Sequence, residues 1–274
     1  MAVINTNISA IRATNASISA NKQLGVSMER LSTGKRINSA KDDAAGLAIT
    51  TSMTAQVNGM SQGIRNANDG ISLAQTAEGA LSEITNMLQR VRELAVQASS
   101  GTYQASDRTA MQAEVTALTE QVADVLSTTK FNGNTLFSTT AGTDATFDIQ
   151  TGANSGETVT LTSTAIDGTN ISATALDVTD ATKASTTIDN IDLALTDVNA
   201  TRASLGAGQN RLESAVNNLT SNVANLSDSR SRIEDADYSV ETTAMAKSQI
   251  LSQASTAMIA QANQATEQVM QLLR

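Results

Sequence analysis

The sequence predicts a mainly α-helical fold, a long coiled-coil helical bundle with a small β-hairpin insertion. Two long stretches repeat an apolar residue or alanine every three or four positions, which is typical of a coiled-coil seam. Proline is absent from all 274 residues, and an internal proline costs a helix roughly 3 kcal/mol. Between the helical stretches, a segment rich in Thr, Ser, Gly and Asp alternates polar and apolar residues and predicts the hairpin.

The first long helix is predicted by an apolar stripe from Met53 to Ala98. Its steps alternate between four and three residues, apart from one skip between Ala74 and Ala77. This 3.5-residue repeat keeps one narrow face against a partner helix, and at 1.5 Å per residue the helix extends about 70 Å. The larger seam residues on this helix are Met53, Val57, Met60, Ile64, Ile71, Leu81, Ile84, Leu88 and Val91.

A second, shorter helix is predicted from Met111 to Val125, again with steps of four and three. Ser106 and Asp107 precede this stripe and are suited to cap a helix start. The helix is expected to end before the turn-forming sequence Phe-Asn-Gly at 131–133.

The third helix has the most regular seam, because its steps of three and four continue without exception from Ile188 to Ile233. It matches the first helix in length, so we expect these two helices to pair along their whole extent with the second helix beside them. Arg202, Gln209 and Arg230 occupy seam positions, where polar groups either fix the register or remain exposed. The larger apolar seam residues are Ile188, Ile191, Leu195, Val198, Leu205, Leu212, Val216, Leu219, Val223, Leu226 and Ile233.

The segment at 134–185 is the variable, β-type part of the chain. Residues 146–150 and 158–162 alternate polar and apolar positions on either side of a Gly-Ala-Asn-Ser-Gly sequence, which favours a β-hairpin. A disordered Ser/Thr-rich linker is the alternative interpretation of this composition.

The two chain ends carry weaker amphipathic stripes in segments rich in Ala, Ser, Thr, Asn and Gln. These stripes bury too little area to hold an isolated helix, so we expect both ends to become ordered only against partners. A membrane-surface helix is not favoured, because clustered Lys and Arg and aromatic anchors are lacking. The stripe residues are Ile4, Ile8, Ile11 and Ile18 near the start and Met258, Val269 and Leu272 near the end.

The composition argues against an enzyme. The chain has no Cys, His or Trp, which excludes thiol and imidazole chemistry, disulfides and the common zinc sites. We therefore predict no catalytic, cofactor-binding or metal-binding residues. The net charge of −9 disfavours nucleic-acid binding, and no apolar stretch is long enough for a membrane-spanning helix. The start of the chain lacks the basic and apolar regions of a secretory signal peptide.

Several long motifs, in order along nearly the whole chain, resemble those of the bacterial flagellin family. The N-terminal motifs are MAVINTNISAIRA at the start, LSTGKRINSAKDDAAGLAI at 31–49, QRVRELAVQAS at 89–99 and FNGNTLF at 131–137. The C-terminal motifs are SLGAGQNRLESAVNNL at 204–219, SRIEDADYSVETTAMAKSQIL at 231–251 and the closing LLR. The chain departs from a common family pattern around Ala265 and Thr266, near which a proline often stands, and we expect an unbroken terminal helix there.

The resemblance implies antiparallel helices in discontinuous domains that are formed by both chain ends. The terminal helices at 1–40 and 235–274 are expected to form the inner tube domain. Residues 41–234 are expected to form the long-helix bundle domain, with 134–185 as its variable outer segment. Many flagellins insert large outer domains in the middle of the sequence, and this chain has almost no room for them.

The function that the resemblance implies is mechanical. The chain is expected to be a structural subunit that polymerises into the hollow helical bacterial flagellar filament for swimming motility. The implied partners are many copies of the same chain, the flagellar cap and hook-junction proteins, and an export chaperone at the C-terminal helix. The implied location is extracellular, in the flagellum, after type III export without a cleaved signal peptide. No cofactors and no membrane insertion are expected.

The resemblance also implies a receptor-recognition surface, because vertebrate Toll-like receptor 5 recognises this part of flagellins. The corresponding family positions fall on Gln89, Arg90, Leu94 and Glu114. Arg90 and Leu94 are four residues apart and are therefore expected to share a helical face. The alternative is that this face serves subunit packing along the filament.

Other functions remain as alternatives at this point. A hook–filament junction protein or a minor flagellin paralogue shares the helical ends. A chemoreceptor-like signalling coiled coil shares the acidic helices rich in Ala, Ser and Gln. The β-type insertion argues against the chemoreceptor, which needs a continuous helical tip.

Overall fold

The structure, a computed structural model, describes residues 6–272, with the side chains of Thr266 and 269–272 outside the description. The described chain is mainly helical, as the sequence predicts. It folds into two compact units, which we call the terminal unit (6–55 and 225–272) and the central unit (56–224). The helices are α1 (Ile8–Thr33), α2 (Ala44–Ser99), α3 (Ala105–Thr128), α4 (Ala181–Glu234) and α5 (Tyr238–Leu272). The strands are β1 (Lys130–Phe131), β2 (Asn134–Thr135), β3 (Ala145–Gln150) and β4 (Thr158–Ser163).

The helices α2, α3 and α4 begin earlier than their apolar stripes predict, because small and polar residues form their first turns. α2 begins at Ala44, where Asp43 Oδ1 caps the helix by accepting a hydrogen bond from the Gly46 amide at 2.9 Å. α3 begins at Ala105, where the carboxylate of Asp107 accepts a hydrogen bond from the Gln104 amide at 3.0 Å. Asp107 therefore lies inside the first turn of α3 and takes part in capping its start, as the sequence predicts.

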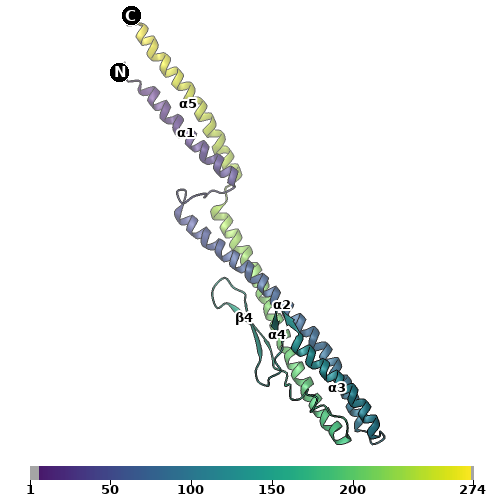
Figure 1. Cartoon of the computed structure of the whole chain (residues 1–274). Coiled ribbons are helices and arrows are strands. Elements are labelled where there is room, and N and C mark those ends of the chain that lie inside the picture. The colour runs from purple at the N-terminus through teal and green to yellow at the C-terminus, as the bar shows by residue number, and fades with distance from the viewer. Residues whose placement is uncertain (1–5, 273–274) are drawn as a thin grey trace. The chain divides into compact units, whose positions relative to one another are not determined.

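In the central unit, α2, α3 and α4 form a bundle and the hairpin of β3 and β4 lies beside it (Figure 1). The two strands pair antiparallel from Ala145 opposite Ser163 to Gln150 opposite Thr158, which confirms the predicted hairpin. The segment around the hairpin also contributes buried side chains to the core, so the disordered-linker interpretation is wrong. These side chains are Leu136, Phe137, Ile166, Ile171, Leu176 and Val178.

The hairpin approaches both long helices closely at glycine positions. A Cβ added at Gly63 of α2 would overlap the Thr151 carbonyl group, and one added at Gly208 of α4 would overlap the Leu161 side chain. Ser204 Oγ also donates a hydrogen bond to the Thr162 carbonyl at 2.9 Å. Gly208 lowers the helix propensity of α4, and the structure shows that it makes room for the strand.

The sequence predicts only a turn at 131–133, whereas the structure has a second short hairpin of β1 and β2. Asn132 and Gly133 link the two strands with φ values of 48° and 86°. Two successive residues with positive φ are the backbone conformation of a type I′ turn, which Asn-Gly favours. Strands of two residues are too short for an alternating pattern to reveal.

In the terminal unit, α1 and α5 pack antiparallel along their length (Figure 1). α5 continues without a break to Leu272, as expected from the missing proline. The segments that follow α1 and α4 are joined by a β-bridge between Lys35 and Asp235. Gly34 supplies the left-handed turn after α1, with φ of 70°, and its carbonyl accepts a hydrogen bond from the Ala236 amide at 3.0 Å.

Candidate assembly surfaces

A seam of small side chains joins α1 to α5. Its buried members are Ala20 and Ser27 on α1 and Glu241, Ser248 and Ser255 on α5. On each helix these residues are seven positions apart, which is the heptad spacing of a coiled coil. Four of the five are Ala or Ser, and the seam positions between and beyond them include larger apolar residues that are half-buried, namely Leu24, Leu31, Met245 and Ile259.

Polar contacts fix the alignment of α1 with α5. Ser252 Oγ donates a hydrogen bond to Asn21 Oδ1 at 2.8 Å, and Arg30 NH1 lies 3.6 Å from Glu241 Oε2. Glu241 is only 7% exposed, and its Oε1 has no hydrogen-bond partner. A buried carboxylate without its cation is costly. The repeated Ala and Ser would tolerate a shift of seven residues along the seam. Such a shift is opposed because it would separate the buried Glu241 carboxylate from Arg30.

Many bulky apolar side chains of α1 and α5 lie outside this seam and face solvent. The predicted stripe residues with described side chains are 51–61% exposed, namely Ile8, Ile11, Ile18 and Met258. Ile4 lies outside the described residues, as do the side chains of Val269 and Leu272. Five further exposed apolar residues lie on these helices, namely Met28, Tyr238, Val240, Ile250 and Leu251. A concentration of exposed apolar residues of this kind marks an interaction surface.

The proposed seam residues of α2 and α4 are all buried or half-buried. Those at most 1% exposed are Leu81, Ile84, Leu88, Val91, Ile191, Val198, Leu205 and Leu212. Half-buried members that pack against the same core are Ile71, Ile188, Leu195 and Val216. The remaining half-buried members are Met53, Val57, Met60, Ile64, Leu219, Val223, Leu226 and Ile233. α3 has 24 residues against 56 in α2, so a third helix covers only part of the α2–α4 seam.

Two polar residues at seam positions contact the partner helix. Arg202 NH2 lies 3.6 Å from Glu78 Oε1, and Arg230 NH1 donates a hydrogen bond to Thr54 Oγ1 at 3.2 Å. Each contact lies within one of the two units. Both arginines therefore favour the antiparallel register of α4 against α2.

The receptor-recognition surface implied by the resemblance is only partly accessible. Gln89, Arg90 and Glu114 are exposed, and Arg90 Nε lies 2.9 Å from Glu114 Oε1, which ties α2 to α3. Hydrogen bonds to two carboxylates raise the pKa of Arg90, and the bond to Glu114 contributes more than the bond to Glu93. Leu94 is 3% exposed and belongs to the core. The assignment of Leu94 to this surface is corrected, because Leu94 lies at the edge of the helical face of Arg90 that packs into the core.

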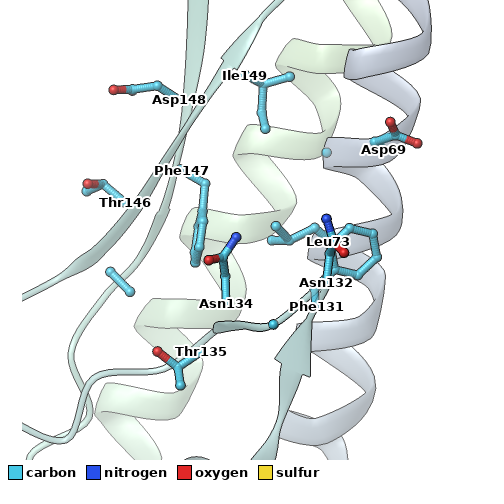
Figure 2. Close-up of a pocket in the computed structure, with 13 residues that line it drawn as sticks. Asp69, Leu73, Phe131, Asn132, Asn134, Thr135, Thr146, Phe147, Asp148 and Ile149 are labelled. Atoms are coloured by element: carbon cyan, nitrogen blue, oxygen red, sulfur yellow. The ribbon is translucent and has the colours of Figure 1, made fainter.

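A hollow of about 990 Å³ lies beside the β3 strand in the central unit (Figure 2). Alternate residues of β3 point to opposite sides of the strand, with Phe147 and Ile149 toward the helices and Asp148 away from them. Leu73 and Asp69 of α2 line the hollow on its helical side. The lining thus mixes aromatic and aliphatic side chains with polar ones, which include Asn132, Asn134, Thr135 and the two carboxylates.

Residues 6–272 carry neither a metal-binding cluster nor a membrane-spanning helix. Within this range, no group of three or more His, Cys, Asp or Glu side chains is placed to hold a metal ion. The helices of the same range do not include one that is long and apolar enough to cross a membrane.

Comparisons with known proteins match both ends of the chain. A family model described as bacterial flagellin N-terminal helical region matches residues 4–142, and one described as bacterial flagellin C-terminal helical region matches residues 188–273. A flagellin of Halalkalibacterium halodurans is 46% identical over 275 residues, covering 99% of this chain and 100% of the relative. The flagellar filament 33 kDa core protein of Treponema phagedenis is 39% identical, covering 99% of this chain and 100% of the relative. The crystal structure of Bacillus cereus flagellin is 37% identical with a TM-score of 0.49, covering 57% of this chain and 88% of that one.

Proposed function

This chain belongs to the bacterial flagellin family, and we propose that its terminal helix pair is the surface through which copies of the chain join. The chain is a structural subunit that polymerises into the extracellular flagellar filament. Relatives that match over their whole length are flagellins, so the junction-protein and chemoreceptor alternatives are not favoured. The observation that carries our proposal about the ends is the exposure of bulky apolar residues along α1 and α5.

Burial of these residues against neighbouring copies supplies the driving force for assembly. Complete burial of one Ile, Leu or Met side chain contributes about 1.5–3 kcal/mol. Several such residues on each subunit offset the cost of ordering two helices that pair through small side chains. A contact between different faces of two copies does not close on itself, and so it extends into an open helical filament.

We assign the inner tube domain to 1–40 and 235–274 and the bundle domain to 41–234, with 134–185 on its outer side. The compact units support a division of this kind, because both chain ends fold together in the terminal unit. The terminal unit also includes the first residues of α2 and the last residues of α4, beyond the assigned boundary. In the bundle domain, the α2–α4 seam is the source of the stiffness that a rotating filament needs.

Finer partners follow from family membership. We assign to this chain the flagellar cap and hook-junction proteins as partners at the two ends of the filament, and an export chaperone on α5 before assembly. The exposed apolar residues of α5 give a chaperone a surface to cover. Export without a cleaved signal peptide, through the flagellar type III apparatus, is consistent with a chain that has no Cys to form crosslinks during transit.

Recognition by vertebrate Toll-like receptor 5 is assigned to the face of Gln89, Arg90 and Glu114. The support is the exposure of these three residues and the ion pair that holds Arg90 against Glu114. Arg90→Ala and Glu114→Ala are expected to weaken receptor binding, with Lys130→Ala, an exposed residue outside this face, as the control. Unchanged binding by both variants would contradict the assignment.

The assembly proposal is tested with the full chain carrying Ile11→Ser and Ile18→Ser. We expect this variant to keep the circular-dichroism spectrum of the central helices but to lose seeded filament growth, measured by sedimentation and negative-stain microscopy. Asn15→Ser changes an exposed polar residue of the same helix and serves as the control. Normal growth of the double variant would overturn the proposal that α1 carries the assembly surface.

A further inference from the structure

A groove lies along one side of the α1–α5 pair, with a volume of about 530 Å³. Its α1 wall is formed by small side chains, including Ala16, Ser19 and Ala20. Its α5 wall includes Ala244 and Leu251, and Leu251 is 47% exposed although it lines the groove. Gln23 and Lys247 also line the groove, one on each wall. The groove is therefore shallow on the α1 side, mainly apolar in exposed surface, and open to an incoming side chain.

A ridge stands on another side of the same helix pair. Ile11 and Ile18 are 52% and 61% exposed and, being seven residues apart, project from the same side of α1. Ser19 follows Ile18 directly and is turned about 100° from it around the helix. The ridge of Ile11 and Ile18 and the groove that contains Ser19 therefore face different directions.

We propose that Ile11 and Ile18 of one copy of this chain insert into the α1–α5 groove of a neighbouring copy in the filament. This inference rests on the proposed function, in which the terminal helix pair mediates assembly. The occupant of the groove is a second copy of this chain, because the chain belongs to a family that polymerises with itself. Each copy carries one ridge and one groove, so every groove has a ridge available to fill it. The groove and the ridge also belong to the same helix pair, which keeps the contact continuous with the assembly surface.

The dimensions of the two surfaces agree. Seven residues of helix span about 10.5 Å, which is the distance along α1 between the two isoleucines. The α5 wall extends from Ala244 to Ser255, or about 16 Å of helix, and is long enough to take both side chains. Small residues on the α1 wall leave room for the branched isoleucine side chains, which fill the groove with apolar surface.

The direction of assembly follows from the placement of ridge and groove on different sides. Each copy offers its ridge to one neighbour and its groove to another, which is a heterologous contact. Two copies cannot satisfy both surfaces by pairing with each other about a two-fold axis through this contact. The α1–α5 pairs of successive copies therefore add side by side in one direction. Because the contact does not close on itself, growth continues.

The absence of Cys from the chain allows a direct test by disulfide trapping. The full-length double variant Ile18→Cys, Leu251→Cys is assembled from seeds and then oxidised, and the products are separated under non-reducing conditions. Because a disulfide requires Cα atoms within about 7 Å, we expect a ladder of crosslinked multimers with loss of the monomer band. The matched control is Ile18→Cys, Ile250→Cys, since Ile250 is also exposed but does not line the groove. Each single variant is a second control and should give no ladder.

The outcomes separate this inference from the proposed function. If the parent chain forms no filaments, the proposed function fails. If the parent and the variants form filaments but the ladder is absent, or appears with Ile250→Cys instead, the ridge-and-groove contact is wrong. If both Leu251→Cys and Ile18→Cys prevent assembly while Ile250→Cys does not, the selective loss supports the contact.

Discussion

Arg30 and Glu241 face each other across the α1–α5 seam, with Arg30 NH1 3.6 Å from Glu241 Oε2. Among the residues that the structure describes, Glu241 is the only charged residue that is buried. The other fully buried seam residues are Ala and Ser, which repeat every seven residues and do not distinguish one register from the next. This pair therefore gives the terminal helices a specific alignment that packing of small side chains does not supply.

The first prediction concerns this pair. Arg30→Ala leaves the Glu241 carboxylate buried without a cation, and we expect it to weaken the α1–α5 pair by about 1–3 kcal/mol. The thermal depolymerisation temperature of filaments measures the loss. Adding Glu241→Gln should recover part of it, because a neutral amide is less costly to bury than a carboxylate. Lys22→Ala, an exposed residue of α1, is the control, and equal effects of Arg30→Ala and Lys22→Ala would contradict the role of the pair.

The second prediction compares two leucines on the α2–α4 seam. Leu88 is 1% exposed beneath the third helix, whereas Leu219 is half-buried where α3 does not reach. Leu88→Ala should lower the free energy of unfolding of the monomer by about 2–5 kcal/mol through a cavity and lost burial. Leu219→Ala should cost clearly less, because solvent already reaches part of that side chain. Urea denaturation followed by circular dichroism measures both, and equal losses would contradict the view that α3 decides the burial of the seam.

The third prediction concerns pH and the start of α4. Lys183 Nζ lies 2.8 Å from Asp177 Oδ2, and this contact, with a hydrogen bond from Thr179, lowers the pKa of Asp177 from 3.8 to about 2. Because the pKa is lower in the folded state, the carboxylate contributes stability above pH 4 and loses it as pH falls toward 2. The contribution is at most about 2 kcal/mol. The stability of Asp177→Asn should depend less on pH in this range than that of the parent, and parallel curves would rule out this role.

Local patterns in the sequence predict the elements that depend on neighbouring residues. The alternation at 146–150 and 158–162 predicts the hairpin, since strand faces repeat every second residue. Contacts between distant segments are not predictable in this way. Leu94 lies beside the exposed Arg90 in helical position, yet the packing of α3 buries it. Gly208 weakens a helix by propensity alone, and only the approach of Leu161 explains its presence.

The terminal stripes also show which features a local sequence pattern predicts and which depend on contacts with a distant helix. The sequence predicts an amphipathic stripe of Ile8, Ile11 and Ile18, and the structure places these residues on the exposed side of α1. The fully buried residues of the same helix are Ala20 and Ser27, which give a weak apolar signal because Ala and Ser are common throughout the chain. The hydrophobic pattern alone therefore does not show which side of α1 packs against α5.

The last prediction concerns the stability of that pair in the free subunit. The fully buried residues of the α1–α5 seam are mainly Ala and Ser, and its larger members such as Leu24 and Met245 are only half-buried. Less apolar area therefore holds these helices together than in the central core, which fully buries large side chains such as Leu88. Hydrogen–deuterium exchange should therefore be fast for the amides of α1 and α5 in a verified monomer and slow for the central helices. In filaments, exchange of α1 and α5 should slow strongly, because neighbouring copies cover Ile11, Ile18 and Met258. Exchange of α1 and α5 that is as slow in the monomer as in the filament would mean that the small-residue seam is sufficient by itself, and that assembly is not what stabilises the ends.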